Sequence, residues 1–399
     1  EYSLNTIILA LGVAIITFII GVANAWLITF GKFHWKNLIE ILLIAPLAIP
    51  SFASSYAYSG VFDYYGLAQS FIRDIINYQD SQSIIPNINS LGGAIFILSF
   101  TLYPYVYILA RNSFMNQSRD TICAALIMGS SNLKVFYRIA LPLARPAIAG
   151  GIILVIMESI ADFGTVYYLG VDTLSIGIYK TWFGFGDLNS AARMSVILLS
   201  FSGILIWIEK KNRRGKQNYY TSTRKSKFST MDLIKGKKIV FSYIFLFLTI
   251  FISFIIPIVW LVKNSFEVNL QDIKYIILPS LINTICLGLT AAFIIVFFAL
   301  IFCFSSRVFS RSLRFICSFS KLGYAAPGAV IAIGVMIPLV FIDRAMNDLS
   351  MYLFDFNLGL IFSGTIFALV FAYLVRFLSV AYNPIEVAYG KLGKNFDNI

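Results

Sequence analysis

Charged residues are scarce in this chain. Asp, Glu, Lys and Arg make up 13% of its 399 residues, about half of the roughly 25% that a soluble domain carries. Hydrophobic residues make up 59%, and the mean hydropathy is +0.81. This composition excludes a soluble globular core. It indicates an all-α polytopic membrane protein, whose spans are helices because a helix satisfies its own backbone in lipid.

Histidine and cysteine are also rare. His34 is the one histidine, and Cys123, Cys286, Cys303 and Cys317 form no Cys-x-x-Cys pair. We therefore expect no disulfide framework, no tightly bound metal and no membrane metalloenzyme. The chain also lacks the glycine-rich loop ending in Lys-Ser or Lys-Thr that binds nucleotide phosphates. We expect it not to be an enzyme and to hydrolyse no ATP itself.

Long apolar runs, by contrast, are frequent. Each is near the roughly 20 residues that a helix needs to cross the hydrocarbon core. They lie at about 4–29, 38–60, 91–110, 148–170, 192–208, 239–262, 280–304, 315–342 and 357–380. We predict a membrane span from each of these runs.

Lysine and arginine gather in alternate loops. The loops near 32–36, 111–145, 307–314 and 391–394 and the stretch 210–238 hold most of the basic residues. Because basic loops stay in the cytoplasm, these segments are predicted to be cytoplasmic. The basic run at 210–238 lies between two spans and has few aromatic residues, so topology explains it better than nucleic-acid binding. We expect the protein to lie in the lipid bilayer and to bind no nucleic acid.

The sequence contains an internal repeat. Leu4-Asn5-Thr6-Ile7 opens one span and Ile282-Asn283-Thr284-Ile285 opens another, and in each half a proline-containing span follows, at 47–60 and 324–334. Such a repeat predicts two parallel domains. We place the first at 1–209, a basic cytoplasmic linker at 210–238, and the second at 239–399. The first domain lacks a counterpart of the span 239–262, so we expect a sequence truncated at both ends.

The stretch 111–151 is too long and polar for a simple turn between spans. Residues 121–128 favour a helix whose Ile122, Ala125 and Leu126 share one face. Gly129 favours a left-handed turn, and residues 130–132 favour a cap on a second helix. Pro142 and Pro146 are expected to end that helix before the next span. The result is a compact cytoplasmic knob with a surface of small residues. An amphipathic helix on the membrane surface is the alternative.

The spacing of residues in this stretch resembles the coupling loop of ABC-importer permeases. The matching positions are Ala124, Ala125, Gly129, Ile139, Leu141 and Pro142. The family usually has a glutamate where Cys123 stands here. The resemblance implies two tandem type I (MetI-like) permease domains, a docked dimer of ABC ATPase subunits that binds ATP and Mg, and a periplasmic substrate-binding protein. No cofactor is implied in this chain. The corresponding loop of the second domain would include Glu386, Ala388 and Gly393.

Acidic residues occur within the fourth predicted span. Glu158 and Asp162 are four residues apart and are expected on one helix face. Acids within a span are costly and usually face a cavity or the bundle interior. With Tyr167 and Tyr168 they are candidates for a translocation path, and a hydrogen-bonded structural pair is the alternative.

Two further segments resemble the fused permeases of iron(III) importers. They are residues 161–183, with ADFGTV and GIYKTWF, and residues 322–335. The resemblance implies iron(III) uptake across the bacterial inner membrane, and oxygen ligands of the four path candidates suit that hard cation. Permeases for thiamine, polyamines, sulfate or phosphonate are the closest alternatives. A proton-coupled secondary transporter using Glu158 and Asp162 is a further alternative, and a membrane-bound enzyme a more remote one.

Overall fold

The computed structural model describes residues 1–63, 65–76, 87–214, 236–266, 270–308, 323 and 326–391, and no β-strand occurs among them. The longer helices are α1 (Tyr2–Phe30), α2 (Lys36–Ile44), α3 (Ser51–Phe62), α4 (Leu67–Ile76), α5 (Leu91–Met115), α6 (Arg119–Ile127), α8 (Leu141–Ala161), α11 (Leu188–Arg214), α12 (Lys237–Ile250), α13 (Ile256–Ser265), α15 (Leu278–Val308), α17 (Gly328–Phe354) and α18 (Ile366–Lys391). The shorter ones are η1 (Ala45–Ala48), α7 (Asn132–Val135), η2 (Phe136–Ala140), α9 (Gly164–Tyr168), α10 (Leu174–Tyr179), η3 (Lys180–Gly184), η5 (Phe251–Ile255), α14 (Leu270–Asp272) and η6 (Ile273–Ile277).

Eight helices among the described residues are long and apolar enough to cross a membrane. The bent pair Lys36–Ala48 and Ser51–Phe62 makes nine if it counts as one span. The prediction of an all-α polytopic membrane protein is confirmed. The start of the predicted span at 315–342 lies outside the described residues, and the described helix there begins at Gly328.

Contacts group the chain into two compact units. The first comprises Glu1–Ile176 and Ile204–Phe266, and the second comprises Gly177–Gly203 and Glu267–Ile399. These units are not the predicted domains, because the span of α12 and α13 packs in the first unit, against α1, α2 and α3. The predicted halves rest on the sequence repeat, which packing contacts do not test.

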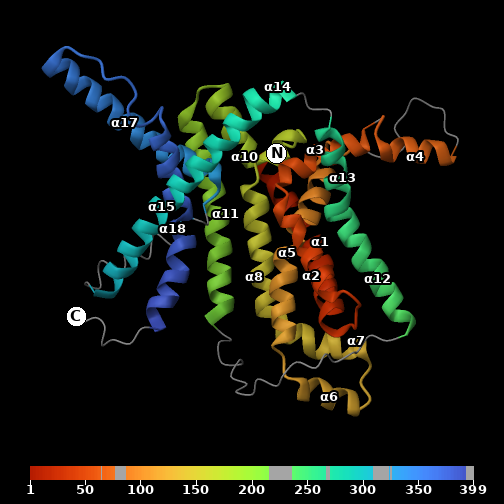
Figure 1. Cartoon of the computed structure of the whole chain (residues 1–399). Coiled ribbons are helices and arrows are strands. Elements are labelled where there is room, and N and C mark those ends of the chain that lie inside the picture. The colour runs from red at the N-terminus through yellow and green to blue at the C-terminus, as the bar shows by residue number, and fades with distance from the viewer. Residues whose placement is uncertain are drawn as a thin grey trace. The chain divides into compact units, whose positions relative to one another are not determined.

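The core of the first unit is formed by α1, α5 and α8, which lie side by side (Figure 1). Glycines allow the close approach: a Cβ at Gly21 would lie 2.8 Å from the Cβ of Val106, and one at Gly151 would lie 3.0 Å from its Cα. Small residues at helix contacts are the usual means of packing in lipid, where no hydrophobic force drives helices together. This trio is therefore the rigid part of the unit.

The second span of the first unit is broken. Its helices α2–η1 and α3 meet at an angle of 94°. Pro50 precedes the first residue of α3, and Pro46 lies at the start of η1. Because proline has no backbone N–H, carbonyls at such a break need other donors. The hydroxyl of Tyr103 donates to the carbonyl of Leu43 at 2.9 Å.

The helix α3 is held on the other side by the span of α12 and α13. That span contains the π-helical segment η5, and the Tyr58 hydroxyl donates to the carbonyl of Ile252 within it. Higher up, a Cβ on Gly60 would collide with the ring of Trp260. The bent span is thus fastened to neighbours above and below its break.

The second unit contains α15, α17 and α18, with α15 and α18 packed along each other. Asp343 of α17 is 1% exposed. Its carboxylate accepts hydrogen bonds from the amides of Phe362 and Ser363 and from the Ser363 hydroxyl at 2.6 Å. Asp343 therefore ties the segment before α18 back onto α17.

One predicted helix boundary was wrong. Residues 132–161 form a single span-length helix, so Pro142 and Pro146 do not end it. The reason is the π-helical segment η2, which closes with a bond from the Leu141 amide to the Phe136 carbonyl directly before Pro142. A wider turn there relieves the clash that a proline ring makes with the preceding turn.

Candidate functional site

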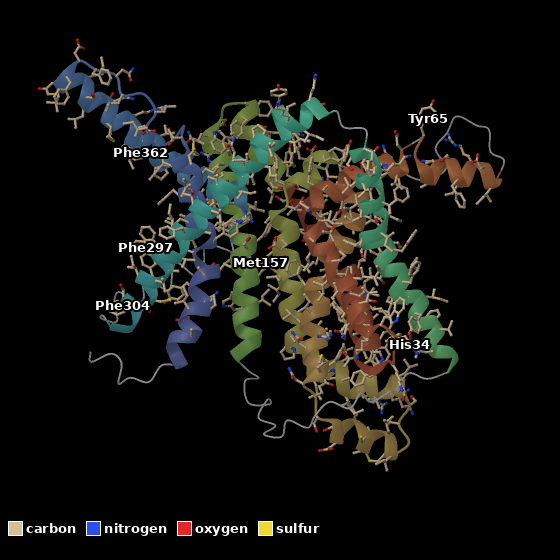
Figure 2. The ribbon with its side chains drawn as sticks, in the orientation of Figure 1. His34, Tyr65, Met157, Phe297, Phe304 and Phe362 are labelled. Carbon is tan, nitrogen blue, oxygen red and sulfur yellow. The ribbon has the colours of Figure 1, made fainter. Side chains whose placement is uncertain are left out.

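A helical knob lies at the end of the first unit that also carries His34, while Tyr65 beside α4 lies at the opposite end (Figure 2). The knob comprises α6, α7 and η2, residues 119–140. His34 belongs to a loop with basic residues, so this end is the one predicted to be cytoplasmic. The placement of the knob agrees with that orientation.

The turn at Gly129 has the predicted conformation. Gly129 has a φ of +82°, in the left-handed region. Its amide donates to the Leu126 carbonyl at 2.9 Å, and the Ser130 amide donates to the Ala125 carbonyl at 3.0 Å. This pair of bonds is the Schellman motif that ends many helices at a glycine. The Ser131 hydroxyl then caps α7 by accepting from the Lys134 amide at 3.4 Å.

The two ends of the knob are fastened to the bundle. The Gln117 side chain, which precedes α6, donates to the carbonyl of Ala140, which precedes α8, at 2.8 Å. Trp26 of α1 packs against Phe114 and Phe136, with ring centroids 5.8 and 4.9 Å away. A movement of the knob would therefore be passed to α1, α5 and α8.

One face of the knob is buried and the other is open. Ile122 and Ala125 are buried, and Leu126, Ile139 and Leu141 pack against the same core. Exposed apolar side chains lie around the Gly129 turn: Ile127, Met128, Leu133 and Tyr137, which are 86%, 79%, 67% and 63% exposed. Ala124 is also exposed and Pro142 half-buried. We call Ile127, Met128, Leu133 and Tyr137 the apolar rim.

The second predicted loop differs from the first. Glu386 and Ala388 are exposed, but they lie within α18, which continues through Pro384 to Lys391. The part of the second predicted coupling loop that the structure describes, up to Lys391, is thus helical. Gly393 lies outside the described residues.

Asp162 lies directly after α8 and caps the short helix α9. The carboxylate accepts from the amides of Thr165 and Val166, at 2.9 and 3.3 Å, and from the Thr165 hydroxyl at 3.1 Å. It also accepts from the Ser51 hydroxyl, at the first turn of α3, at 2.8 Å. Two carboxylate oxygens offer about four acceptor positions. Asp162 therefore uses its acceptors to hold two helix starts together.

The expectation that Glu158 and Asp162 share one helix face was wrong. The helix α8 ends at Ala161, and Asp162 has extended backbone with a ψ of 130°. Glu158 is half-buried on α8, one turn before its end. Figure 2 labels its neighbour Met157 on α8. Glu158 thus lies within α8, whereas Asp162 lies in the break that follows α8.

Tyr167 and Tyr168 lie on α9, and the break brings them beside α3. Tyr168 packs edge-on against Phe52 and Tyr56, with ring centroids 5.6 and 6.0 Å away, and Tyr56 packs against Trp260 at 4.8 Å. Tyr167 stacks on Phe163 at 5.3 Å and is 54% exposed. Sequence reasoning found the two tyrosines but missed Ser51, Tyr56 and Trp260, which lie far away in the chain.

No group of three or more His, Cys, Asp or Glu side chains that could hold a metal ion occurs in the described part of the chain. The site combines a helix-capping carboxylate, phenol groups and a half-buried glutamate with a knob at the cytoplasmic end. These features belong to a multi-pass membrane protein with polar groups placed at breaks between its helices.

Residues 17–210 match the family described as "Binding-protein-dependent transport system inner membrane component". This segment, which includes the knob and Asp162, belongs to that family of inner-membrane transport components. The chain is similar to an Fe(3+)-transport system permease protein of Haemophilus influenzae, at 24% identity over 99% of the chain and 71% of that protein.

Two other relatives differ in how much of the chain they match. A ferric transport system permease protein of Actinobacillus pleuropneumoniae is 24% identical over 98% of the chain, which spans 57% of that relative. A probable sulfate transport system permease protein of Helicosporidium is 27% identical over 51% of the chain and 75% of its own length. The two ferric permeases thus align along both predicted domains.

Proposed function

We propose that the chain is the transmembrane subunit of a bacterial ABC importer that takes up iron(III). The observation that carries this proposal is the alignment of ferric permeases over 99% and 98% of the chain, whereas the sulfate permease aligns over 51%. A periplasmic binding protein delivers the substrate, and a separate ATPase dimer with ATP and Mg drives transport. The chain itself contributes the path and the coupling contact.

The knob is the proposed contact with the ATPase. Its apolar rim is exposed beside Gly129, although apolar side chains that face water on a polar loop are unfavourable without a partner. The root of the knob is fastened through Gln117 and Trp26, so docking on the rim can move the bundle. We assign Ala124, Gly129 and the rim to the docking surface, and Ala125, Ile139, Leu141 and Pro142 to its support.

The proposed path is lined by Glu158, Tyr167 and Tyr168. Carboxylate and phenol oxygens are ligands that suit a hard cation such as iron(III). A path must also release its substrate, so weak and separated ligands serve it better than a closed metal site. Asp162 holds the path helices α3 and α9 together, and its hydrogen bonds leave little acceptor capacity for an ion.

The proposed mechanism is alternating access. ATP closes the ATPase dimer, the docked knobs move with it, and the bundle opens outward to receive iron from the binding protein. Hydrolysis returns the bundle to its inward-facing state. ATP can drive the cycle because it binds the closed dimer more tightly than the open one.

The substrate assignment is tested by uptake of labelled ions into cells that lack the gene. Cells complemented with the gene should accumulate radiolabelled iron(III) faster than cells with an empty vector. Labelled sulfate, thiamine and a polyamine serve as parallel probes. Gene-dependent uptake of one of these, without gene-dependent iron uptake, would refute the iron assignment and name the alternative.

A further inference from the structure

An ion pair connects the bent span to α5 near the knob. The Nη2 atom of Arg111 lies 2.6 Å from a carboxylate oxygen of Glu40, and the side chains are 24% and 19% exposed. A charge-assisted contact this short is a strong one when water is partly excluded. Glu40 is the middle residue of α2, and Arg111 lies one turn before the end of α5.

A second polar link between these helices is found among the described residues. Tyr103 lies two turns before Arg111 on α5, and Leu43 lies about one turn after Glu40 on α2. The Tyr103 hydroxyl donates to the Leu43 carbonyl. The link nearer the knob joins two charges, and the other reaches Leu43, one residue before the end of α2. The helix α2 is therefore held to α5 at its middle and near its end, before η1.

Among the described residues, Arg111 forms no second ion pair. Tyr107, on the same face of α5 between the two links, is fully buried, and its hydroxyl has no hydrogen-bond partner. The Nε atom of Arg111 is also buried and unpaired. If Glu40 lost its charge, Arg111 would be a half-buried cation without a counter-ion, which is costly.

The helix α5 does not depend on this pair for its place. It packs along α1 and α8 over much of its length, with its buried face in the main core. The bent span has fewer packing contacts with α5, and Glu40 contributes an ion pair to them. Loss of the pair is thus expected to free α2 relative to α5 and to leave the α1, α5 and α8 bundle assembled.

We propose that Glu40 and Arg111 are positioning residues that transmit knob movement to the translocation path. The knob begins at Arg119, separated by three residues from the end of α5 at Met115, so a shift of the knob moves the end of α5 that carries Arg111. The ion pair pulls α2 with it, and α2 leads through η1 to Ser51 and so to Asp162. The inference rests on the proposed function, since it assigns a route for the coupling that an ATP-driven importer needs.

The test uses the full transporter, with its ATPase and binding protein, reconstituted in vesicles. Glu40→Gln and Arg111→Gln should each lower iron(III) uptake about tenfold, within the range by which mutations along a coupling route change the coupling between two sites. ATP hydrolysis should continue, so the ATP consumed per ion transported should rise. A merely structural role would lower both rates together with the amount of assembled protein.

Rescue makes the test specific for the pair. The exchange Glu40→Arg with Arg111→Glu, and the neutral double variant Glu40→Gln with Arg111→Gln, should both transport better than either single variant. The neutral variant carries the test if the exchanged pair does not assemble. Arg145→Gln, an exposed arginine at the same end of α8, is the matched control and should transport like the wild type.

Three results would overturn the proposal. Single variants that transport like the wild type would show that the pair does not transmit movement. Double variants no better than the singles would show that the two residues act separately. If the wild type shows no ATP-dependent uptake of any probe, the proposed function fails, and the pair proposal fails with it.

Discussion

Ser51 and Asp162 are 111 residues apart in the sequence and are joined by a hydrogen bond of 2.8 Å. Ser51 begins α3 after the break in the second span, and Asp162 follows the end of α8. This one contact therefore connects the break in the second span with the break after α8. Broken helices inside a membrane protein are tolerated where they line a path and their backbone is satisfied locally, and this contact supplies part of that satisfaction.

The first prediction concerns this contact. Ser51→Ala removes one hydrogen bond and should destabilise the protein by about 1 kcal/mol. Asp162→Ala removes the cap of α9 as well and should cost about 2 kcal/mol or more. Asp162→Asn keeps the shape of the side chain but replaces one acceptor oxygen with an NH₂ donor. Its destabilisation should therefore lie between those of Ser51→Ala and Asp162→Ala. Thermal unfolding in detergent measures the order, and a wild-type melting curve for Asp162→Ala would contradict it.

The second prediction separates the turn at Gly129 from the surface around it. Asn and Asp both tolerate a positive φ better than other side chains, and the position has open space around it. Gly129→Asn should therefore keep most of the uptake. Gly129→Asp places a charge beside the apolar rim and should abolish ATP-dependent uptake while insertion stays intact. Equal uptake by the two variants would argue against docking at the rim.

The third prediction concerns the buried hydroxyl at the bend. Tyr103→Phe leaves the Leu43 carbonyl without its side-chain donor and should destabilise the protein by about 1–3 kcal/mol. Tyr137→Phe is the matched control, because Tyr137 is 63% exposed on the knob. Unfolding midpoints of the two variants in the same detergent should differ. Identical midpoints would mean that the hydroxyl does not support the bend.

The fourth prediction concerns the contact between α3 and α13. A methyl group at Gly60 would collide with the Trp260 ring, so Gly60→Ala should destabilise the wild type by about 1–3 kcal/mol. In a Trp260→Leu background the same change should cost much less, which a double-mutant cycle detects. Gly150→Ala, in open space on α8, is the control. Equal costs in both backgrounds would rule out the steric account.

Local signals in the sequence predicted the knob well. Gly129 with its small and polar neighbours indicated a left-handed turn and a following cap, and both are present because a few adjacent residues determine them. The prediction from the prolines was wrong, because the π-helical segment η2 directly before Pro142 widens the turn and lets the helix continue. A wider turn of this kind leaves no simple pattern in the sequence.

The role of Asp162 could have been predicted in part. Asp is one of the residue types preferred at the start of a helix, so a new helix after residue 162 could have been expected from the sequence. The contact of Asp162 with Ser51 could not be predicted, because nothing near either residue indicates a partner so distant in the chain. The packing of α12 and α13 on α1, α2 and α3 is equally a long-range property.

The energy source of transport tests the central claim most directly. Cells that carry the gene are assayed for labelled iron(III) uptake after a protonophore with cellular ATP held constant, and after ATP depletion. An ATP-driven importer should keep its uptake in the first condition and lose it in the second. Uptake that collapses with the protonophore while ATP remains would contradict the account and favour a proton-coupled transporter.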